Sequence, residues 1–121
     1  IYYTLIMKTI VKKPWGSFEI INEGIKYTVK KIIVNPGGQL SLQSHAHRSE
    51  HWLIAEGNAE VLINEKKFNL SANQHIFIPQ GAKHRLANSR DQTLIVVEMW
   101  FGDNLDENDI KRYEDIYNRK S

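Results

Sequence analysis

Residues Gln43–Gly57 read Gln-Ser-His-Ala-His-Arg-Ser-Glu-His-Trp-Leu-Ile-Ala-Glu-Gly, and this stretch decides the expected fold. Its first nine residues hold three histidines, a glutamate and a glutamine. Gln43, His45 and His47 alternate, so on a β-strand their side chains point to one face. Glu50 follows after a short gap and heads an apolar run that is typical of the next strand. Imidazole nitrogens with carboxylate and amide oxygens are ligands that suit a divalent metal ion.

A further histidine, His84, ends the turn-rich segment Pro79–His84, and we expect it to join the same metal ion. His51 directly follows Glu50, so in a regular strand it faces the other way and supports the fold rather than the metal. His75 lies outside both segments and is expected to be an ordinary side chain.

Length and composition limit the classes of protein that fit. The 121 residues suit one domain with one core. A formal net charge of only +2 argues against nucleic acid or a membrane surface as partners. The absence of cysteine excludes thiolate-bound zinc and disulfides, and no apolar run reaches the roughly 20 residues that span a bilayer. We expect a cytoplasmic protein.

The N-terminus is mildly apolar and too short for a convincing signal peptide. The chain starts with Ile1 and has Met7 just inside, so either the first six residues are the remnant of a longer protein or Met7 is the natural start. We expect residues 1–11 to form an N-terminal extension or a leading strand, and residues 12–121 to form the domain.

Short β-rich segments recur about every ten residues with turn signals between them, which predicts an antiparallel sandwich or barrel. Two of them form a hairpin about Asn64 and Glu65. The predicted strands are Ser17–Asn22, Tyr27–Val34, Leu40–His47, His51–Ala55, Ala59–Ile63, Lys66–Leu70, His75–Ile78, His84–Ala87 and Thr93–Phe101.

The final stretch has a different pattern. Ile110, Tyr113, Ile116 and Tyr117 recur at helical spacing, and Asp106 stands where an N-cap would lie. These residues predict one C-terminal helix that packs on the barrel.

The two histidine-containing segments, Gln43–Gly57 and Pro79–His84, resemble the paired motifs of the cupin superfamily. The first motif is matched by Gly37, Gln43, His45, Glu50 and Gly57, with Gln43 in place of its first histidine. The second is matched by Pro79, Gly81, His84 and Asn88, with Asn73 where the motif has glycine. Asparagine tolerates a left-handed backbone, so this departure is mild. The resemblance implies an all-β fold, the cupin double-stranded β-helix or jelly-roll barrel.

A narrower resemblance covers nearly all of residues 12–119. The chain is similar to the type II phosphomannose isomerase domain in five segments: Lys13–Gly16, Leu40–Gln43, His45–Trp52, Lys83–Leu86 and Asn108–Asp115. In that family this domain is usually the C-terminal part of a bifunctional protein that also carries a mannose-1-phosphate guanylyltransferase. The present chain has neither the length nor a Gly-rich nucleotide loop for that second activity.

The resemblance leaves two ligand sets open. The preferred set is Gln43, His45, Glu50 and His84, because phosphomannose isomerases place a Gln-x-His pair at the metal. The alternative set replaces Gln43 with His47. Zinc is the expected ion, with manganese, iron, nickel or cobalt as alternatives.

The implied activity is interconversion of mannose 6-phosphate and fructose 6-phosphate, in GDP-mannose and polysaccharide precursor synthesis. This aldose–ketose isomerisation needs a base and an anchor for the phosphate. His47 is the first candidate for the base, and Glu98 is a weaker one. Arg48 and Arg85 are expected to be catalytic, and with Lys83 to bind the substrate phosphate.

Other expectations concern partners and surfaces. The partners are a hexose 6-phosphate and a second copy of the chain, since pairing of edge strands in a homodimer covers exposed edges. The lysines expected on solvated faces are Lys12, Lys13, Lys30, Lys31, Lys66 and Lys67. The rival functions are another metal cupin enzyme, such as a dioxygenase or a different sugar-phosphate isomerase, and a non-catalytic sugar-binding or regulatory cupin.

Overall fold

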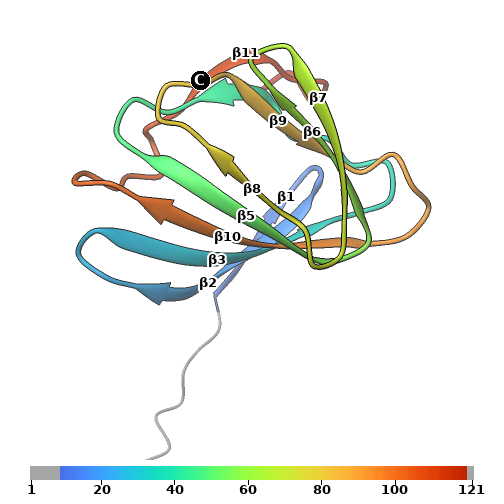
Figure 1. Ribbon diagram of the computed structural model, residues 1–121, viewed down its shortest axis with the longest axis horizontal. Coiled ribbons are helices and arrows are strands. Elements are labelled where there is room, and N and C mark those ends of the chain that lie inside the picture. The colour runs from blue at the N-terminus through green and yellow to red at the C-terminus, as the bar shows by residue number, and fades with distance from the viewer. Residues whose placement is uncertain (1–8, 120–121) are drawn as a thin grey trace, which may run out of the picture.

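The computed structural model describes residues 9–119 and consists of two antiparallel sheets that face each other (Figure 1). The first sheet has the order β1 (Ile10–Lys13), β2 (Gly16–Glu23), β3 (Tyr27–Val34), β10 (Leu94–Phe101), β5 (Ser49–Glu56) and β8 (His75–Ile78). The second has the order β11 (Lys111–Glu114), β4 (Leu42–Ser44), β9 (His84–Ala87), β6 (Asn58–Ile63) and β7 (Lys66–Ser71). The expected all-β fold is confirmed, and the described part of the chain contains no helix that could span a membrane.

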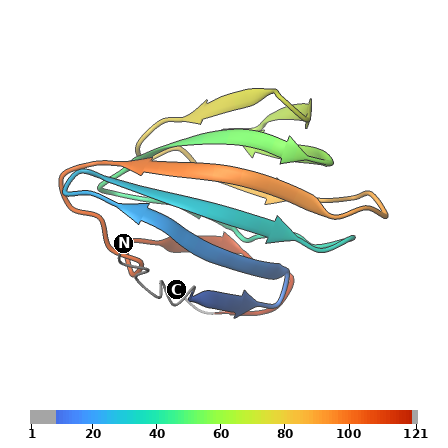
Figure 2. The same ribbon diagram turned by 90° about the horizontal axis from the view of Figure 1, so that it is seen from below.

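Strand β10 lies in the middle of the six-stranded sheet, between β3 and β5, as Figure 2 shows. Its register fixes which side chains share the inner face. Val96 pairs with Ile32 on one side and with Ile54 on the other, so one row of apolar side chains crosses three strands. Glu98 pairs with Lys30 and with Trp52, which places charged groups in the next inward row.

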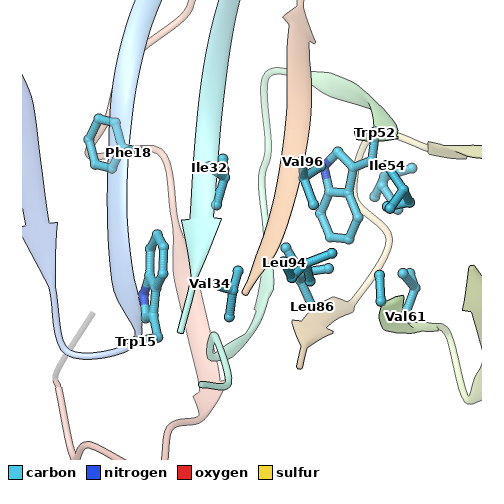
Figure 3. Packing of buried hydrophobic residues seen from close by; sticks show 12 residues of the cluster. Trp15, Phe18, Ile32, Val34, Trp52, Ile54, Val61, Leu86, Leu94 and Val96 are labelled. Atoms are coloured by element: carbon cyan, nitrogen blue, oxygen red, sulfur yellow. The ribbon is translucent and has the colours of Figure 1, made fainter. Parts of the chain in front are cut away.

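The hydrophobic core fills one half of the space between the sheets (Figure 3). Val34 and Leu94 are fully buried at that end, where they meet Leu86 and Val61 of the second sheet. Further along the same strands the inward positions become polar or charged: Thr28 and Lys30 in β3, Glu98 in β10 and Glu50 in β5. The sandwich therefore has an apolar half that supplies stability and a polar half that is free to carry a site.

Most predicted strands are present within a residue or two of their expected bounds. The hairpin between β6 and β7 turns at Asn64 and Glu65, whose φ angles of 43° and 75° allow the tight two-residue turn. Asn73 has a φ of 74°, so it adopts the left-handed backbone expected where the motif has glycine. The segment predicted as the strand Leu40–His47 forms a regular strand only over β4, although the N–H of Leu40 also donates to the carbonyl of Leu86, and its last residues leave the sheet.

The prediction of a C-terminal helix was wrong. Residues 111–114 form β11, which pairs with β4 through Lys111 opposite Ser44 and Arg112 opposite Gln43. The Asp106 carboxylate accepts a hydrogen bond from the backbone N–H of Asn108, and the Asp115 carboxylate accepts from the N–H groups of Tyr117 and Arg119. Both acids therefore stabilise turns and not helix starts. The edge of β4 offers unpaired backbone groups, and strand pairing there outweighs the helical spacing of the apolar residues.

Candidate metal centre

Three buried side chains from three strands or strand ends converge in the polar half of the sandwich. His45 follows β4, Glu50 lies in β5 and His84 begins β9, so both sheets contribute. One ligand atom from each of the three lies within 4.8 Å of the others. His45 Nε2 is 3.0 Å from Glu50 Oε2, and the rings of His45 and His84 have centroids 5.0 Å apart. The two sequence motifs thus meet at one point.

The second nitrogen of each imidazole is held by a backbone carbonyl. His45 Nδ1 lies 2.7 Å from the carbonyl oxygen of Asp109, and His84 Nδ1 lies 2.9 Å from that of Ala82. A carbonyl only accepts, so in the neutral imidazoles the proton sits on Nδ1 and Nε2 carries the lone pair that would bind a metal. This outer support is the arrangement found around metal-binding histidines, and it fixes the orientation of the rings.

The protonation states also fit a metal. Burial by itself would raise the pKa of Glu50, but the contact with His45 and the positive charge of Arg48 lower that pKa below its ordinary value. Burial lowers the pKa of His84, which keeps this imidazole neutral near pH 7. Ionised carboxylates and neutral imidazoles are the forms that bind divalent ions. The three residues therefore fit a divalent metal by donor type, convergence and charge.

Beside this cluster lies a cavity of about 440 Å³ between the sheets. Gln43 lines it from β4, opposite His84 in the strand register. The amide nitrogen of Gln43 donates to the hydroxyl and the carbonyl of Ser41, which leaves Oε1 as its ligand atom. Of the two ligand sets, this placement favours the one with Gln43.

His47 is exposed and does not line the cavity. Strand β4 ends at Ser44, so the alternation that was expected to align His47 with His45 stops before it. The backbone N–H groups of Ala46 and His47 instead donate to the two carboxylate oxygens of Asp109, each at 2.9 Å. This turn leaves His47 exposed and outside the cluster.

Arg48, in contrast, is buried beside the cluster and lines the cavity. Its Nε donates to Glu50 Oε2 at 2.9 Å, its Nη2 lies 3.1 Å from His45 Nε2, and its guanidinium lies 3.5 Å from the centre of the Trp100 ring. Lys83 and Arg85 lie outside the cavity lining. The Lys83 ammonium lies over the ring of Tyr113, and Arg85 forms a 3.5 Å ion pair with Glu114. Arg85 faces outward because its neighbours His84 and Leu86 are the inward positions of β9.

Several charged residues that line the cavity were not singled out from the sequence. The expectation that Lys30 is solvated was wrong, since this residue is 3% exposed. The signal was available: Lys30 shares its parity in β3 with the core residues Ile32 and Val34. The others are Lys13, Glu107, Arg112 and Arg119.

Glu98 is the second buried carboxyl in the cavity wall. Burial and the negative charge of Glu50 raise the pKa of Glu98 to about 8, although Lys30 and Arg48 act in the opposite direction and the Trp100 indole donates a hydrogen bond to Oε1. The folded chain therefore binds this proton more tightly than the unfolded chain does.

This shift predicts a pH effect on stability. Because the folded pKa of Glu98 is raised above 4.5, its favourable contribution is complete below that pH and is lost as the pH rises toward 8. Between pH 5 and pH 8.5, the free energy of unfolding of Glu98→Gln is expected to rise by roughly 3–5 kcal/mol relative to that of the unaltered chain. Urea titrations of both proteins with a chelator present measure it, and a difference that does not change with pH would contradict it.

Asp109 supports the first motif, and its replacement gives a second prediction. Burial would raise the pKa of Asp109, but the hydrogen bonds from Ala46 and His47 lower it, so its carboxylate stays charged and holds this turn. Asp109→Ala is expected to weaken metal affinity about 10–100-fold, the range found for outer-shell changes, although every proposed ligand remains. Metal titration measures the loss, and Asp103→Ala, which alters an exposed ion pair with Lys26, is the matched control. Equal affinity in both variants would rule out this support role.

Comparisons with known proteins agree with this geometry. The family model described as "Mannose-6-phosphate isomerase C-terminal" matches residues 4–115. The chain is 45% identical over 111 residues to the alginate biosynthesis protein AlgA of Pseudomonas putida, a match that covers 92% of this chain and 23% of that protein. It is 46% identical over 107 residues to mannose-1-phosphate guanylyltransferase 2 of Escherichia coli O157:H7, covering 88% of this chain and 22% of that protein. The chain thus spans about a quarter of the length of these relatives.

Solved structures agree on the fold. An RmlC-like cupin from Shewanella frigidimarina superimposes with a TM-score of 0.73 at 17% identity, covering 84% of this chain and 89% of that one. The chain therefore has a cupin fold and belongs to the family of mannose-6-phosphate isomerase C-terminal domains.

Proposed function

We propose that the chain is a metal-dependent isomerase that interconverts mannose 6-phosphate and fructose 6-phosphate, in the supply of GDP-mannose and polysaccharide precursors. The observation that carries the proposal is the buried cluster of His45, Glu50 and His84 at the wall of a cavity large enough for a hexose phosphate. The family description and the names of the relatives support this choice of substrate.

In this proposal, the metal cluster binds the reacting end of the substrate, and cations elsewhere in the cavity bind its phosphate. A divalent ion held by the cluster and Gln43, zinc in our proposal, would polarise the oxygens of the substrate carbonyl and hydroxyl groups. Arg48 adds a fixed positive charge next to these groups and holds Glu50 in position. The buried walls exclude water from the reacting carbons, which strengthens every electrostatic contact inside the cavity.

The substrate phosphate requires cations that reach the cavity. Lys83 and Arg85 do not line it, so we propose this role for side chains that do. A guanidinium can pair with a phosphate through two parallel hydrogen bonds, which makes the arginines the better anchors. Apart from Lys30, the cations that line the cavity are Lys13, Arg48, Arg112 and Arg119. Pairing of two copies in a homodimer and a place in the cytoplasm complete the proposal.

A coupled assay on the purified chain tests the proposal. Mannose 6-phosphate is supplied, formation of fructose 6-phosphate is followed, and the metal content is measured before and after chelation. Turnover that disappears with the metal and returns when zinc or manganese is added is the expected result. Bound metal without turnover on mannose, glucose or fructose 6-phosphate would overturn the isomerase proposal and favour a binding role. Turnover of another substrate that stops without oxygen would point to a dioxygenase instead.

A further inference from the structure

Lys30 and Glu98 are two buried ionisable side chains in the cavity wall, outside the metal cluster. They are Cα partners on the neighbouring strands β3 and β10, and both side chains point inward. Lys30 is 3% exposed and Glu98 is 6% exposed, and both line the cavity. Burial of ionisable groups is costly, so the presence of both side chains at inward positions calls for a chemical reason.

The Lys30 ammonium is held by aromatic rings and by one displaceable partner. Its Nζ lies 3.7 Å from the centre of the Trp100 ring and 4.1 Å from that of Phe18. Its hydrogen-bonded partner is Glu107, whose side chain is 51% exposed and lies between β10 and β11. A ligand in the cavity can therefore replace Glu107 at the ammonium without unpacking the core. Burial lowers the pKa of Lys30, which favours donation of its proton to a ligand.

Glu98 faces the same space with one oxygen available. Within residues 9–119, the indole N–H of Trp100 donates to Oε1, and Oε2 is the atom left to meet a ligand. Glu50 pairs with Trp100 and Trp52 pairs with Glu98, so the two glutamates are diagonal neighbours on one face. Their Cα atoms are then roughly 7–8 Å apart, so Glu98 lies on the same wall of the cavity as the metal cluster.

We propose that Glu98 is the catalytic acid–base for the carbon-bound proton and that Lys30 is the catalytic acid–base for the sugar oxygens. The assignment rests on the proposed isomerase function and names the groups that carry out its central step. It takes the base role away from His47, which is exposed and does not line the cavity.

The step balances with these two groups alone. In the open-chain aldose, the Glu98 carboxylate removes the proton from C2, the electrons of that bond form the C1–C2 double bond, and the carbonyl electrons move to O1. The Lys30 ammonium donates a proton to O1 and gives an enediol. The Lys30 amine then takes the hydroxyl proton from O2, the C2–O2 double bond forms, and Glu98 returns its proton to C1. Both side chains end in their starting forms.

Glu98→Gln and Lys30→Met test the assignment. In deuterated water, both the coupled turnover and the exchange of the C2 proton of mannose 6-phosphate are followed. Glu98→Gln is expected to lower both by about 10²–10⁴-fold, the range for loss of a positioned acid or base. Lys30→Met is expected to lower both by about 10²–10³-fold, as for loss of a group that stabilises charge on oxygen.

Matched controls separate chemistry from folding and binding. Glu56→Gln makes the same chemical change at an exposed end of β5, and Lys31→Met makes it at the adjacent, outward position of β3; both are expected to keep turnover. Metal content and affinity for fructose 6-phosphate are measured on all four variants. Loss of exchange with retained metal and ligand binding supports the assignment.

Three other results overturn it. Turnover and exchange that persist in Glu98→Gln, or a loss of activity that follows a loss of metal, would overturn the role of Glu98 while the isomerase function stands. Absence of turnover and exchange in the unaltered, metal-loaded chain would overturn the proposed function and this assignment together.

Discussion

His84→Ala is expected to remove the metal ion from the protein and to reduce isomerase turnover to background. His84 supplies the second motif's contribution to the cluster, and its Nδ1 is already committed to the carbonyl of Ala82. Apart from His45, no histidine within residues 9–119 joins the cluster, so the loss of His84 leaves too few ligands for a divalent ion. The expected drop in metal affinity exceeds the roughly 10–100-fold loss that outer-shell changes cause. Metal analysis after gel filtration and the coupled assay measure the two effects.

His51→Ala is the matched control for this change. His51 is exposed on the outer face of β5, where its ring lies 4.9 Å from that of Phe77. Its replacement is expected to leave metal content and turnover close to those of the unaltered chain. If His84→Ala kept a full complement of tightly bound metal, the cluster would not be the metal centre.

Arg48→Met is expected to destabilise the metal-free protein by roughly 3–5 kcal/mol, the cost of leaving one charge of a buried pair without its partner. The Arg48 guanidinium is the cation closest to the Glu50 carboxylate, and both side chains are nearly inaccessible to water. Methionine fills much of the same space against Trp100, so the loss of charge and not of volume dominates. Urea titration in the presence of a chelator measures the change.

The same titration with zinc gives the second half of this prediction. Zinc is expected to stabilise Arg48→Met more than the unaltered chain, because the guanidinium and the metal both neutralise Glu50 and compete for it. Arg85→Met is the control: its ion pair with Glu114 is long and the Glu114 side chain is 71% exposed, so the expected change is within about 1 kcal/mol and independent of zinc. Equal effects of the two arginine variants would show that the buried pair has no special weight.

The sequence was sufficient to predict the convergence of His45, Glu50 and His84, for a physical reason. Each ligand lies a fixed number of residues from a tight turn, and turns such as the one at Gly57 have a backbone that few residues adopt; its φ is 87°, and an added Cβ would lie 2.6 Å from the carbonyl oxygen of Thr93. Strand alternation between such fixed points then sets the direction of each side chain.

The predictions for the alignment of His47 with His45 and for the C-terminal helix were wrong because they depend on tertiary contacts that local spacing does not reveal. His47 continues the alternation of Gln43 and His45 in the sequence, but the strand ends at Ser44, where Asp109 from a distant segment captures the backbone. Residues 110–117 have apolar side chains at helical spacing, yet residues 111–114 form a strand because they pair with the edge of β4. Both outcomes are set by tertiary partners, which outweigh local preference.

The prediction that Lys30 is solvated was wrong for the opposite reason. Its inward direction follows from parity in β3, but residue type suggested solvent, because lysine is rarely buried without a partner. The partner, Glu107, lies 77 residues away in the sequence. A charged residue at an inward position of an otherwise apolar strand is thus a sign of a cavity and of chemistry, and Glu98 in β10 gives the same sign.

The central place of β10 in the six-stranded sheet also sets the order of events during synthesis. Strands β3 and β5 leave the ribosome long before β10, yet each pairs with β10 along its whole length, so the sheet stays divided until Phe101 has emerged. Closing such distant pairs makes folding slow, since the entropy of the loops must be lost before the contacts form. The metal ligands are made early, whereas the wall that holds Glu98 and the carbonyl that orients His45 are made late. Binding of a metal ion at the cluster is therefore expected only after β10 has joined the sheet.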